Sequence, residues 1–467
     1  MQDRYQTRRY GADIALFGFV VLALLIAQFI TASRSVLVFS EPIGLSYTGL
    51  SVSMPSGNGW QAGKQWEYRE NENTFILSAV FLPVSRKPAA TIQCRYLLAA
   101  PQTGTDIQFQ QWADALDGKI AQTGLLEAGT LAVHWVHIKE REAQRTVFFA
   151  TVQLPNGRQF EIELHEATGD TDRARSVFMG VAESLKFEDV PLLAAGGRVV
   201  AQIKDKGLSE LLHRPTKKSS DKGVTGWAEG GREFFLIKDA SGQPIGFTMD
   251  VFSFPQRASK TSDDSTVSSV DVQIASLLYV RGRYPQEQAS IFKCSNSFDE
   301  FFWKNEGRSL AGATAAEIAA QQTGVMTVTL LAPKPYRRDY QLGPAAIPDF
   351  LFDHLLSQML DDGCQEIVAD LIDTQGKIIP TLISKIQIDD TADLEDQAQF
   401  AFKLEFLDGR GFSETAYLDS QRRVKRRILH QQGLYILERT DAQTVLEQFP
   451  ERAEYILQQT DISGTSL

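Results

Sequence analysis

Cysteine is scarce in this chain of 467 residues, which contains only three. No two of them form a CxxC pair, so the sequence offers neither a zinc-ribbon nor a thioredoxin-like motif. Cys94, Cys294 and Cys364 are also too few for a disulfide framework. If one pair joins, Cys294–Cys364 is expected, because both residues lie in the same predicted domain. The alternative is that all three are buried, unpaired thiols.

Motifs of familiar catalytic centres are missing as well. No HExxH, GxSxG, P-loop or dinucleotide fingerprint occurs in a supporting context. His134 and His137 come nearest to a metal pair, but residues three apart on a strand point to opposite faces. We therefore expect no catalytic residue, no metal and no cofactor, and we do not expect an enzyme.

The sequence contains a single long apolar run, Ile14–Ala32. Its length suits a bilayer-spanning helix, and the arginines before it predict a cytoplasmic N-terminus. A cleaved signal peptide and a buried core helix are the alternatives, but the run is longer than most signal-peptide cores and has no polar face. The prediction is an uncleaved, single-pass anchor at 14–33 in a bacterial inner membrane, with the later domains extracytoplasmic and the bilayer as a partner.

Positive charge is in deficit, with a net charge of −11. This excess of acid argues against nucleic acid as a partner, since phosphate binding needs a basic surface. The acidic run at 389–396 lacks the regular spacing of a calcium loop and is interpreted as solvated. The composition is that of an ordinary globular protein, and the length after the apolar run predicts at least two domains.

The first of these domains, at 45–189, alternates strands and helices. Asn156-Gly157 between two apolar stretches predicts a tight hairpin, and Asp170 is a predicted helix cap. A second helix is predicted from Thr105 or Asp106 to Ile120, on helical apolar spacing. The segments GLSVSMPSGNGW and FEIELHEATGDTDRARSVFMGVAESLKF resemble the PsbP-like family. That resemblance implies an α/β/α sandwich and transfers no function.

The second predicted domain, at 198–455, is richer in strands and follows a linker at 190–197. One apolar helix, Pro348–Leu360, interrupts the strands, with Gly363 as its C-cap. The segments KDASGQPIGFTMDVFSF and ETAYLDSQRRVKRRILHQQGLYILERTDAQTVLEQFP are similar to LolA/LppX-like half-barrels and to the region preceding bacterial transglutaminase-like domains. The catalytic module of the latter has no counterpart here.

The predicted fold class is therefore α+β, with an N-terminal transmembrane helix, a PsbP-like α/β/α sandwich and a strongly curved antiparallel half-barrel with one or two helices. The predicted segments are an arm (1–13), the anchor (14–33), the two domains (45–189 and 198–455), the linker between them and a tail (456–467).

Two residue groups are candidates for binding. The first, predicted to line the concave side of the half-barrel, is aromatic: Phe292, Phe298, Phe301, Phe302 and Trp303. The second is a basic stripe that could bind an anionic partner: Arg423, Lys425 and Arg427. Core packing and pairing with acidic neighbours are the respective alternatives. Two functions follow: binding of a lipid-like ligand in the second domain, or non-enzymatic docking on an envelope transporter or secretion complex.

Overall fold

The computed structural model describes most of the chain. The described residues are 16–17, 19–24, 37–45, 47–57, 60–62, 67–69, 73–81, 90–98, 104–140, 145–167, 169–208, 211, 231–253, 270–281, 286–309, 312–388, 398–430, 433–454 and 456. The predicted acidic loop at 389–396 lies outside them, as do the cytoplasmic arm at 1–13 and nearly all of the predicted tail at 456–467.

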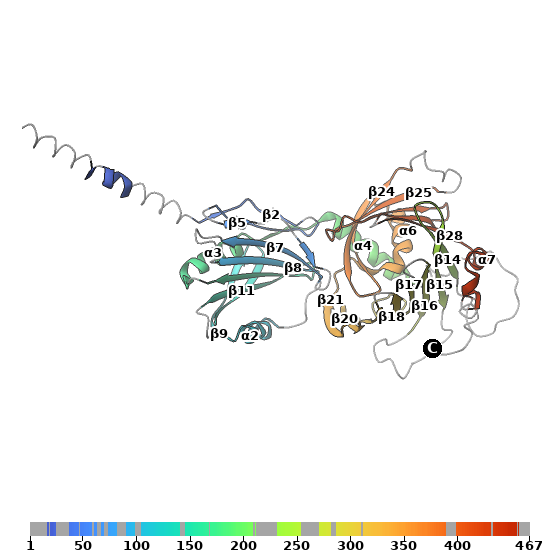
Figure 1. Cartoon of the computed structure of the whole chain (residues 1–467), viewed down its shortest axis with the longest axis horizontal. Coiled ribbons are helices and arrows are strands. Elements are labelled where there is room, and N and C mark those ends of the chain that lie inside the picture. Colours follow the sequence, from blue (N-terminus) through green and yellow to red (C-terminus); the bar gives the residue numbers. More distant parts are fainter. Residues whose placement is uncertain are drawn as a thin grey trace, which may run out of the picture.

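The described chain is mostly β-structure, arranged in two bodies that are each built on a large sheet (Figure 1). Of the apolar run, only residues 16–17 and 19–24 are described, and they are helical. Among the described residues, no helix is both long enough and apolar enough to cross a membrane. The predicted fold class is therefore wrong in its α+β assignment and in its N-terminal transmembrane helix at 14–33. The predicted single-pass membrane anchor is contradicted by the same finding.

The first body is an eight-stranded antiparallel sheet in the order β5-β7-β8-β12-β11-β10-β9, with β6 also paired to β7. Its strands are β5 (Trp60–Ala62), β6 (Glu67–Arg69), β7 (Thr74–Phe81), β8 (Ala90–Leu97), β9 (Gly118–Ala128), β10 (Leu131–Glu140), β11 (Thr146–Gln153) and β12 (Gln159–Glu166). Two small sheets flank it: β1 (Val38–Phe39) with β4 (Pro55–Ser56), and β2 (Ile43–Gly44) with β3 (Leu50–Val52) and β13 (Lys186–Phe187).

Two helices pack on opposite faces of this sheet. Helix α2 (Thr105–Ala115) stacks Trp112 on Phe149 of β11, with 4.5 Å between ring centroids. Helix α3 (Thr171–Glu183) places Phe178 against Phe148, the preceding residue of β11, at 5.3 Å. Because successive strand residues face opposite ways, neighbouring phenylalanines anchor one helix on each side.

Local predictions in this body had mixed outcomes. The hairpin at Asn156-Gly157 is confirmed between β11 and β12, and the Asp170 carboxylate caps α3 as predicted. The helix predicted to reach Ile120 is wrong, because α2 ends at Ala115 and Ile120 lies in β9. Asp117 turns the chain at φ 46°. Strand β9 was missed because it is an exposed edge strand without a buried alternation.

The second body is a fifteen-stranded sheet in the order β21-β20-β19-β18-β17-β16-β15-β14-β28-β27-β26-β25-β24-β23-β22. Its strands are β14 (Arg232–Lys238), β15 (Pro244–Ser253), β16 (Val272–Val280), β17 (Gln286–Cys294), β18 (Phe301–Ser309), β19 (Gly312–Ala320), β20 (Val325–Ala332), β21 (Tyr336–Gln341), β22 (Ala346–Pro348), β23 (Glu366–Ile372), β24 (Ile378–Ile386), β25 (Phe400–Phe406), β26 (Ser413–Leu418), β27 (Val424–His430) and β28 (Leu434–Thr440). All neighbouring pairs are antiparallel except β22 with β23. The first and last strands, β14 and β28, pair in the middle.

Residues 191–197, predicted as a linker, instead form the first half of helix α4 (Pro191–Lys206), which packs on β23 and on helix α6 (Phe352–Asp362). Proline is favourable at a helix start. A Cβ at Gly196 would lie 2.0 Å from the Val368 carbonyl oxygen, so this glycine serves the close approach of α4 to β23. Gly196 therefore serves packing, although a Gly-Gly pair is also typical of a linker.

The large sheet curves around α4 and α6 (Figure 1). A 3-10 turn, η2 (Asp349–Leu351), leads into α6, and Leu355, Leu356 and Met359 are fully buried against the sheet. The predicted helix and its left-handed C-cap at Gly363 (φ 69°) are confirmed. Helix α7 (Ala442–Gln448) and the turn η3 (Pro450–Arg452) lie near the chain end.

The two faces of the curved sheet are covered differently. Val445 of α7 and the adjacent Phe449 are buried against Phe247 and Tyr279 on the outer face of β14–β16. On the concave side, α6 packs its apolar face on the sheet but reaches only part of it. The remaining space is the cavity described below.

A buried ion pair joins the two bodies. Arg158, in the β11–β12 turn, pairs with Asp370 on β23, and the two side chains are 4% and 6% exposed. Nearby, the backbone N–H of Ile378 donates to the side-chain oxygen of Asn73 at 3.3 Å. One continuous apolar core runs through both bodies.

Candidate functional site

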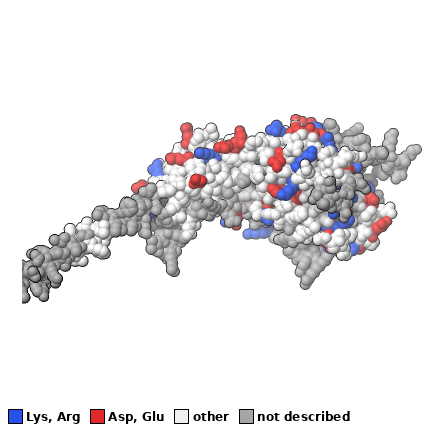
Figure 2. Space-filling model, turned by 90° about the horizontal axis from the view of Figure 1, so that it is seen from above, with Lys and Arg blue, Asp and Glu red and all other residues white. Residues whose placement is uncertain are grey.

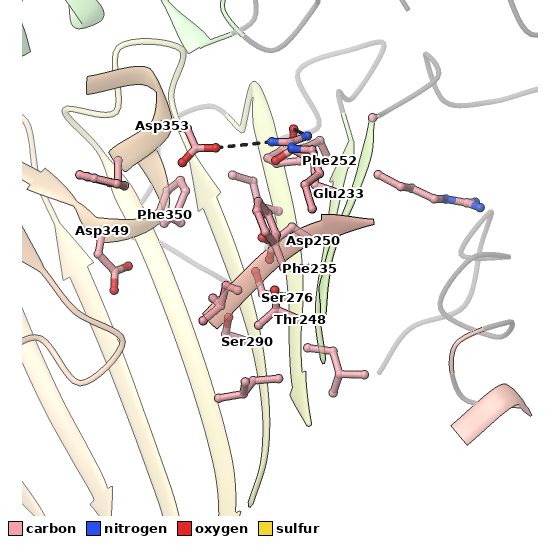
Figure 3. Close-up of a pocket in the computed structure, with 18 of the residues that line it drawn as sticks. Glu233, Phe235, Thr248, Asp250, Phe252, Ser276, Ser290, Asp349, Phe350 and Asp353 are labelled. Carbon is pink, nitrogen blue, oxygen red and sulfur yellow. Dashed lines mark hydrogen bonds and ion pairs between the residues drawn. The ribbon is translucent and has the colours of Figure 1, made fainter. Parts of the chain in front are cut away.

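A cavity of about 580 Å³ opens on the concave face of the large sheet. Ligand pockets typically have about 300–1,000 Å³. Aromatic, carboxylate, hydroxyl and guanidinium groups all face it (Figure 3). Its lining includes Glu233, Phe235, Thr248, Asp250, Phe252, Ile274, Ser276, Leu278, Gln288, Ser290, Trp303, Asp349, Phe350, Phe352, Asp353, Arg232, Arg422, Arg423, Arg427 and Arg439.

Strand register places these side chains in parallel rows across the sheet. Directly opposed residues in an antiparallel pair point to the same face. One row is polar and runs across five strands as Glu233, Asp250, Ser276, Ser290 and Asn305. We call it the polar row.

A further row lies on each side of the polar row. On one side the register aligns Phe252, Ile274, Phe292 and Trp303, which are all apolar. On the other side it aligns Phe235, Thr248, Leu278 and Gln288, a mixed row that begins with an aromatic ring. The cavity floor is therefore amphipathic across the strands.

Four carboxylates and five arginines line the cavity, and the arginines are Arg232, Arg422, Arg423, Arg427 and Arg439. Arg439 donates to Glu233 at 2.8 Å and lies 3.5 Å from Asp353, the contact drawn in Figure 3. Arg427 donates to Glu414 at 3.0 Å. Both guanidinium groups also lie over rings, Arg439 over Phe235 and Arg427 over Phe352, each 5.1 Å from the centroid.

Burial raises the pKa values of three cavity aspartates. The pKa of Asp250 is raised to about 6 by burial and by the neighbouring Glu233, against a lowering hydrogen bond from Ser276. Burial and the charge of Asp373 raise the pKa of Asp349 to about 7. Burial and Glu233 raise the pKa of Asp353 to about 6. The Asp353 side chain is still 25% exposed, because its accessible surface faces the cavity.

These carboxyl groups consequently exchange protons close to neutral pH. In their neutral form they donate hydrogen bonds, and in their charged form they accept them and attract cations. Perturbed carboxyl groups within a cavity are typical of functional sites. Within the described part of the chain, no group of three or more His, Cys, Asp or Glu side chains is arranged to hold a metal ion.

The predicted aromatic group is only partly brought together. Trp303 lines the cavity, and Phe292 lies behind Phe350, with 4.2 Å between ring centroids. Phe301 is buried in the core beside Phe292, as strand alternation dictates. Phe302, the residue between Phe301 and Trp303, faces the other side of β18.

The fifth aromatic residue lies elsewhere. Phe298 lies in the β17–β18 turn at φ 45°, and the Lys204 ammonium is 5.3 Å from its ring centroid. It therefore contributes to packing beside α4.

The predicted basic stripe is paired with acidic residues. Arg423 and Lys425 lie 3.2 and 3.9 Å from Asp419, and Arg427 is bound to Glu414. A register shift opposite Tyr417 and Leu418 shows a bulge at Lys425. The bulge breaks the simple alternation on which the stripe was predicted, so Arg427 turns into the cavity. On the face in Figure 2, positive and negative residues are interspersed.

The remaining candidates have structural roles. Cys94, Cys294 and Cys364 are free, so the pairing considered for Cys294 and Cys364 is not present. His134 is exposed, whereas His137 is buried and stacks on Phe148 at 4.5 Å. The two histidines therefore diverge, as predicted from their spacing.

Sequence reasoning missed the carboxylates of the cavity. A signal was available, since Asp250 and Ser276 occupy inward positions within otherwise apolar strands. A polar residue at a core position indicates a functional group or a buried network. What the sequence could not show is that these positions align across strands.

No known protein-family profile matches the chain, and no curated protein matches it. Among solved structures, a β-barrel-like protein of the DUF1849 family from Brucella abortus aligns with 45% of this chain and 95% of its own, at 9% identity and a TM-score of 0.33. A DUF1089 family protein from Pseudomonas aeruginosa aligns with 45% of this chain and 94% of its own, at 11% identity and a TM-score of 0.20. A protein from Bacteroides thetaiotaomicron aligns with 34% of this chain and 59% of its own, at 14% identity and a TM-score of 0.20.

Proposed function

We propose that the second domain is a non-enzymatic binding module that holds an amphipathic small molecule in the concave cavity. The observation that carries this proposal is the alignment of a polar row beside an apolar row within a space of about 580 Å³. A ligand with an apolar body and one polar group matches that pattern. The resemblances of the two domains to the PsbP-like and LolA-like families stay predictions from the sequence.

Ligand binding is favoured over docking on a protein partner by how the sheet is covered. Helix α7 and Phe449 cover the outer face of β14–β16, whereas the concave face of these strands borders a cavity of about 580 Å³. Small-molecule sites are typically concave and mostly apolar, with a few converging polar groups. A cavity lined by hydrogen-bonding groups therefore supports a guest molecule.

The test is titration of the full-length protein with N-phenyl-1-naphthylamine, a neutral apolar probe whose fluorescence rises in apolar surroundings. We expect saturable binding. Ser290→Trp would place an indole in the polar row and should reduce probe affinity at least about tenfold by filling the cavity.

Ile291→Trp is the matched control, because its side chain points to the opposite face of β17. It should leave probe affinity within about twofold. Absence of saturable binding by folded protein, or equal losses in both variants, would refute the proposal. Circular dichroism establishes that each variant is folded, and Ser276→Leu replaces Ser290→Trp if the latter does not fold.

A further inference from the structure

We propose that the ligand of the concave cavity carries a cationic nitrogen, so that it is an ammonium group joined to an apolar body. This inference rests on the proposed function and deepens it by naming the class of ligand. Its basis is the pairing state of the charges in the wall.

Four of the five arginines that line the cavity, Arg422, Arg423, Arg427 and Arg439, have carboxylate partners. Arg427 is bound to Glu414, and Arg439 to Glu233. Asp250 and Asp349, in contrast, form no ion pair among the described residues: Ser276 donates to the first and the backbone of Phe350 to the second. These two cavity carboxylates thus lack a cationic partner among the described residues, and a guest cation would balance them.

The same asymmetry disfavours an anionic ligand. Arg422 and Arg423 at the rim pair with Asp361 and Asp419. An incoming anion would have to displace a carboxylate from one of these arginines. It would also approach unpaired carboxylates in surroundings of low dielectric constant, where repulsion is strong.

The aromatic wall suits an ammonium group as well. Trp303 and Phe350 line the cavity edge to face, with 5.5 Å between ring centroids and an interplanar angle of 87°. Cations bind over such rings within about 6 Å, and tryptophan gives the strongest interaction. The chain already uses this contact, since Arg427 and Arg439 lie over phenylalanine rings.

Two buried polar atoms in or beside the cavity have no partner within the described protein. The side chains of Trp303 and Asn305 are 2% and 3% exposed, yet Nε1 of Trp303 and Oδ1 of Asn305 have no hydrogen-bond partner among the described residues. Trp303 lines the cavity, and Asn305 ends the polar row beside Ser290. Buried polar atoms are rarely left unpaired.

The experiment compares three ligands of equal chain length: octylammonium, octanol and octyl sulfate. Each competes with N-phenyl-1-naphthylamine on the full-length protein at pH 8, below its aggregation concentration. We expect octylammonium to bind about tenfold tighter than octanol, and octyl sulfate to bind weakest. Equal or tighter binding of octanol or octyl sulfate would overturn the inference and leave the proposed function intact.

Matched variants attribute the preference to the cavity. Asp250→Asn and Asp349→Asn keep shape while removing charge, and the double variant should reduce the preference for octylammonium over octanol to less than about threefold. Asp205→Asn, at an exposed position of α4, removes the same charge outside the cavity. An equal effect of this control would attribute the preference to bulk charge and overturn the inference.

The pH dependence of binding gives a second readout. Octylammonium stays charged between pH 5 and 8, as a lysine side chain does, so any change comes from the protein. The other charged or titratable groups that line the cavity or act on its aspartates are Glu233, Asp373, His354, Arg232, Arg422, Arg423, Arg427 and Arg439. Affinity for octylammonium should rise about tenfold from pH 5 to pH 8 as the aspartates ionise, whereas affinity for octanol should stay constant. A parallel change for both ligands would contradict the inference.

Discussion

Replacing Arg158 with leucine should lower the free energy of unfolding, because Arg158 forms a buried ion pair between the two bodies of this protein. The guanidinium group is 4% exposed and pairs with Asp370, which is 6% exposed, across the interface of the two bodies. In Arg158→Leu the Asp370 carboxylate would be buried without its cation. Water cannot replace the lost partner unless the interface opens.

The expected cost is large because the pair is nearly inaccessible to solvent. Breaking a buried ion pair by removing one partner typically costs about 3–5 kcal/mol, a large share of the roughly 5–15 kcal/mol that stabilises most native proteins. The double variant Arg158→Leu/Asp370→Leu leaves no unpaired charge. We expect it to lie within about 1 kcal/mol of the original protein.

The assay is urea denaturation followed by circular dichroism at neutral pH. The single variant should unfold at lower urea concentration, and the double variant should recover most of the difference. As a control, Lys304→Leu removes an exposed cation paired with Glu306 on the same strand, where about 0–1 kcal/mol is expected. A cost below about 1 kcal/mol for Arg158→Leu would refute the assignment of this ion pair as the link between the bodies.

Two further predictions concern the second body. The folded-state pKa values of the cavity aspartates lie above their unfolded values, so the folded protein binds more protons than the unfolded chain. The free energy of unfolding should therefore fall by about 2–4 kcal/mol between pH 5 and pH 8. In urea titrations Asp349→Asn should reduce this pH dependence, and an unchanged dependence would contradict the prediction. Gly196→Ala should lower stability by about 1–3 kcal/mol despite its gain in helix propensity, because its Cβ would lie 2.0 Å from a backbone oxygen. Gly197→Ala, whose Cβ meets its nearest neighbour at 3.5 Å, should be neutral or stabilising in the same thermal melts.

Local features were predictable wherever the determining contacts are close in sequence. The Asn156-Gly157 hairpin, the Asp170 cap and the Gly363 C-cap depend on backbone conformations that few residue types favour. Strand β9 and helix α4 were not predictable in this way. An exposed edge strand carries no buried alternation. Gly196 of α4 is explained only by its contact with β23, which lies far away in the sequence.

The candidate site illustrates the same limit. Trp303 and Arg427 were singled out from the sequence and do line the cavity, whereas Glu233, Asp250, Asp349 and Asp353 were not. The face predicted for Arg427 was wrong, because a bulge at the preceding residues changes which side chains share a face. Single-residue shifts of this kind leave no reliable mark in composition.

By itself the sequence determined that the chain is globular, acidic and rich in strands, because composition and short-range periodicity report burial of alternate residues. Only the tertiary structure decided which strands are neighbours, and β14 pairs with β28 across some 200 residues of intervening chain. The polar row and the unpaired aspartates exist only through that pairing. A site assembled from cross-strand neighbours depends on register, and register is set by the packing of the whole sheet.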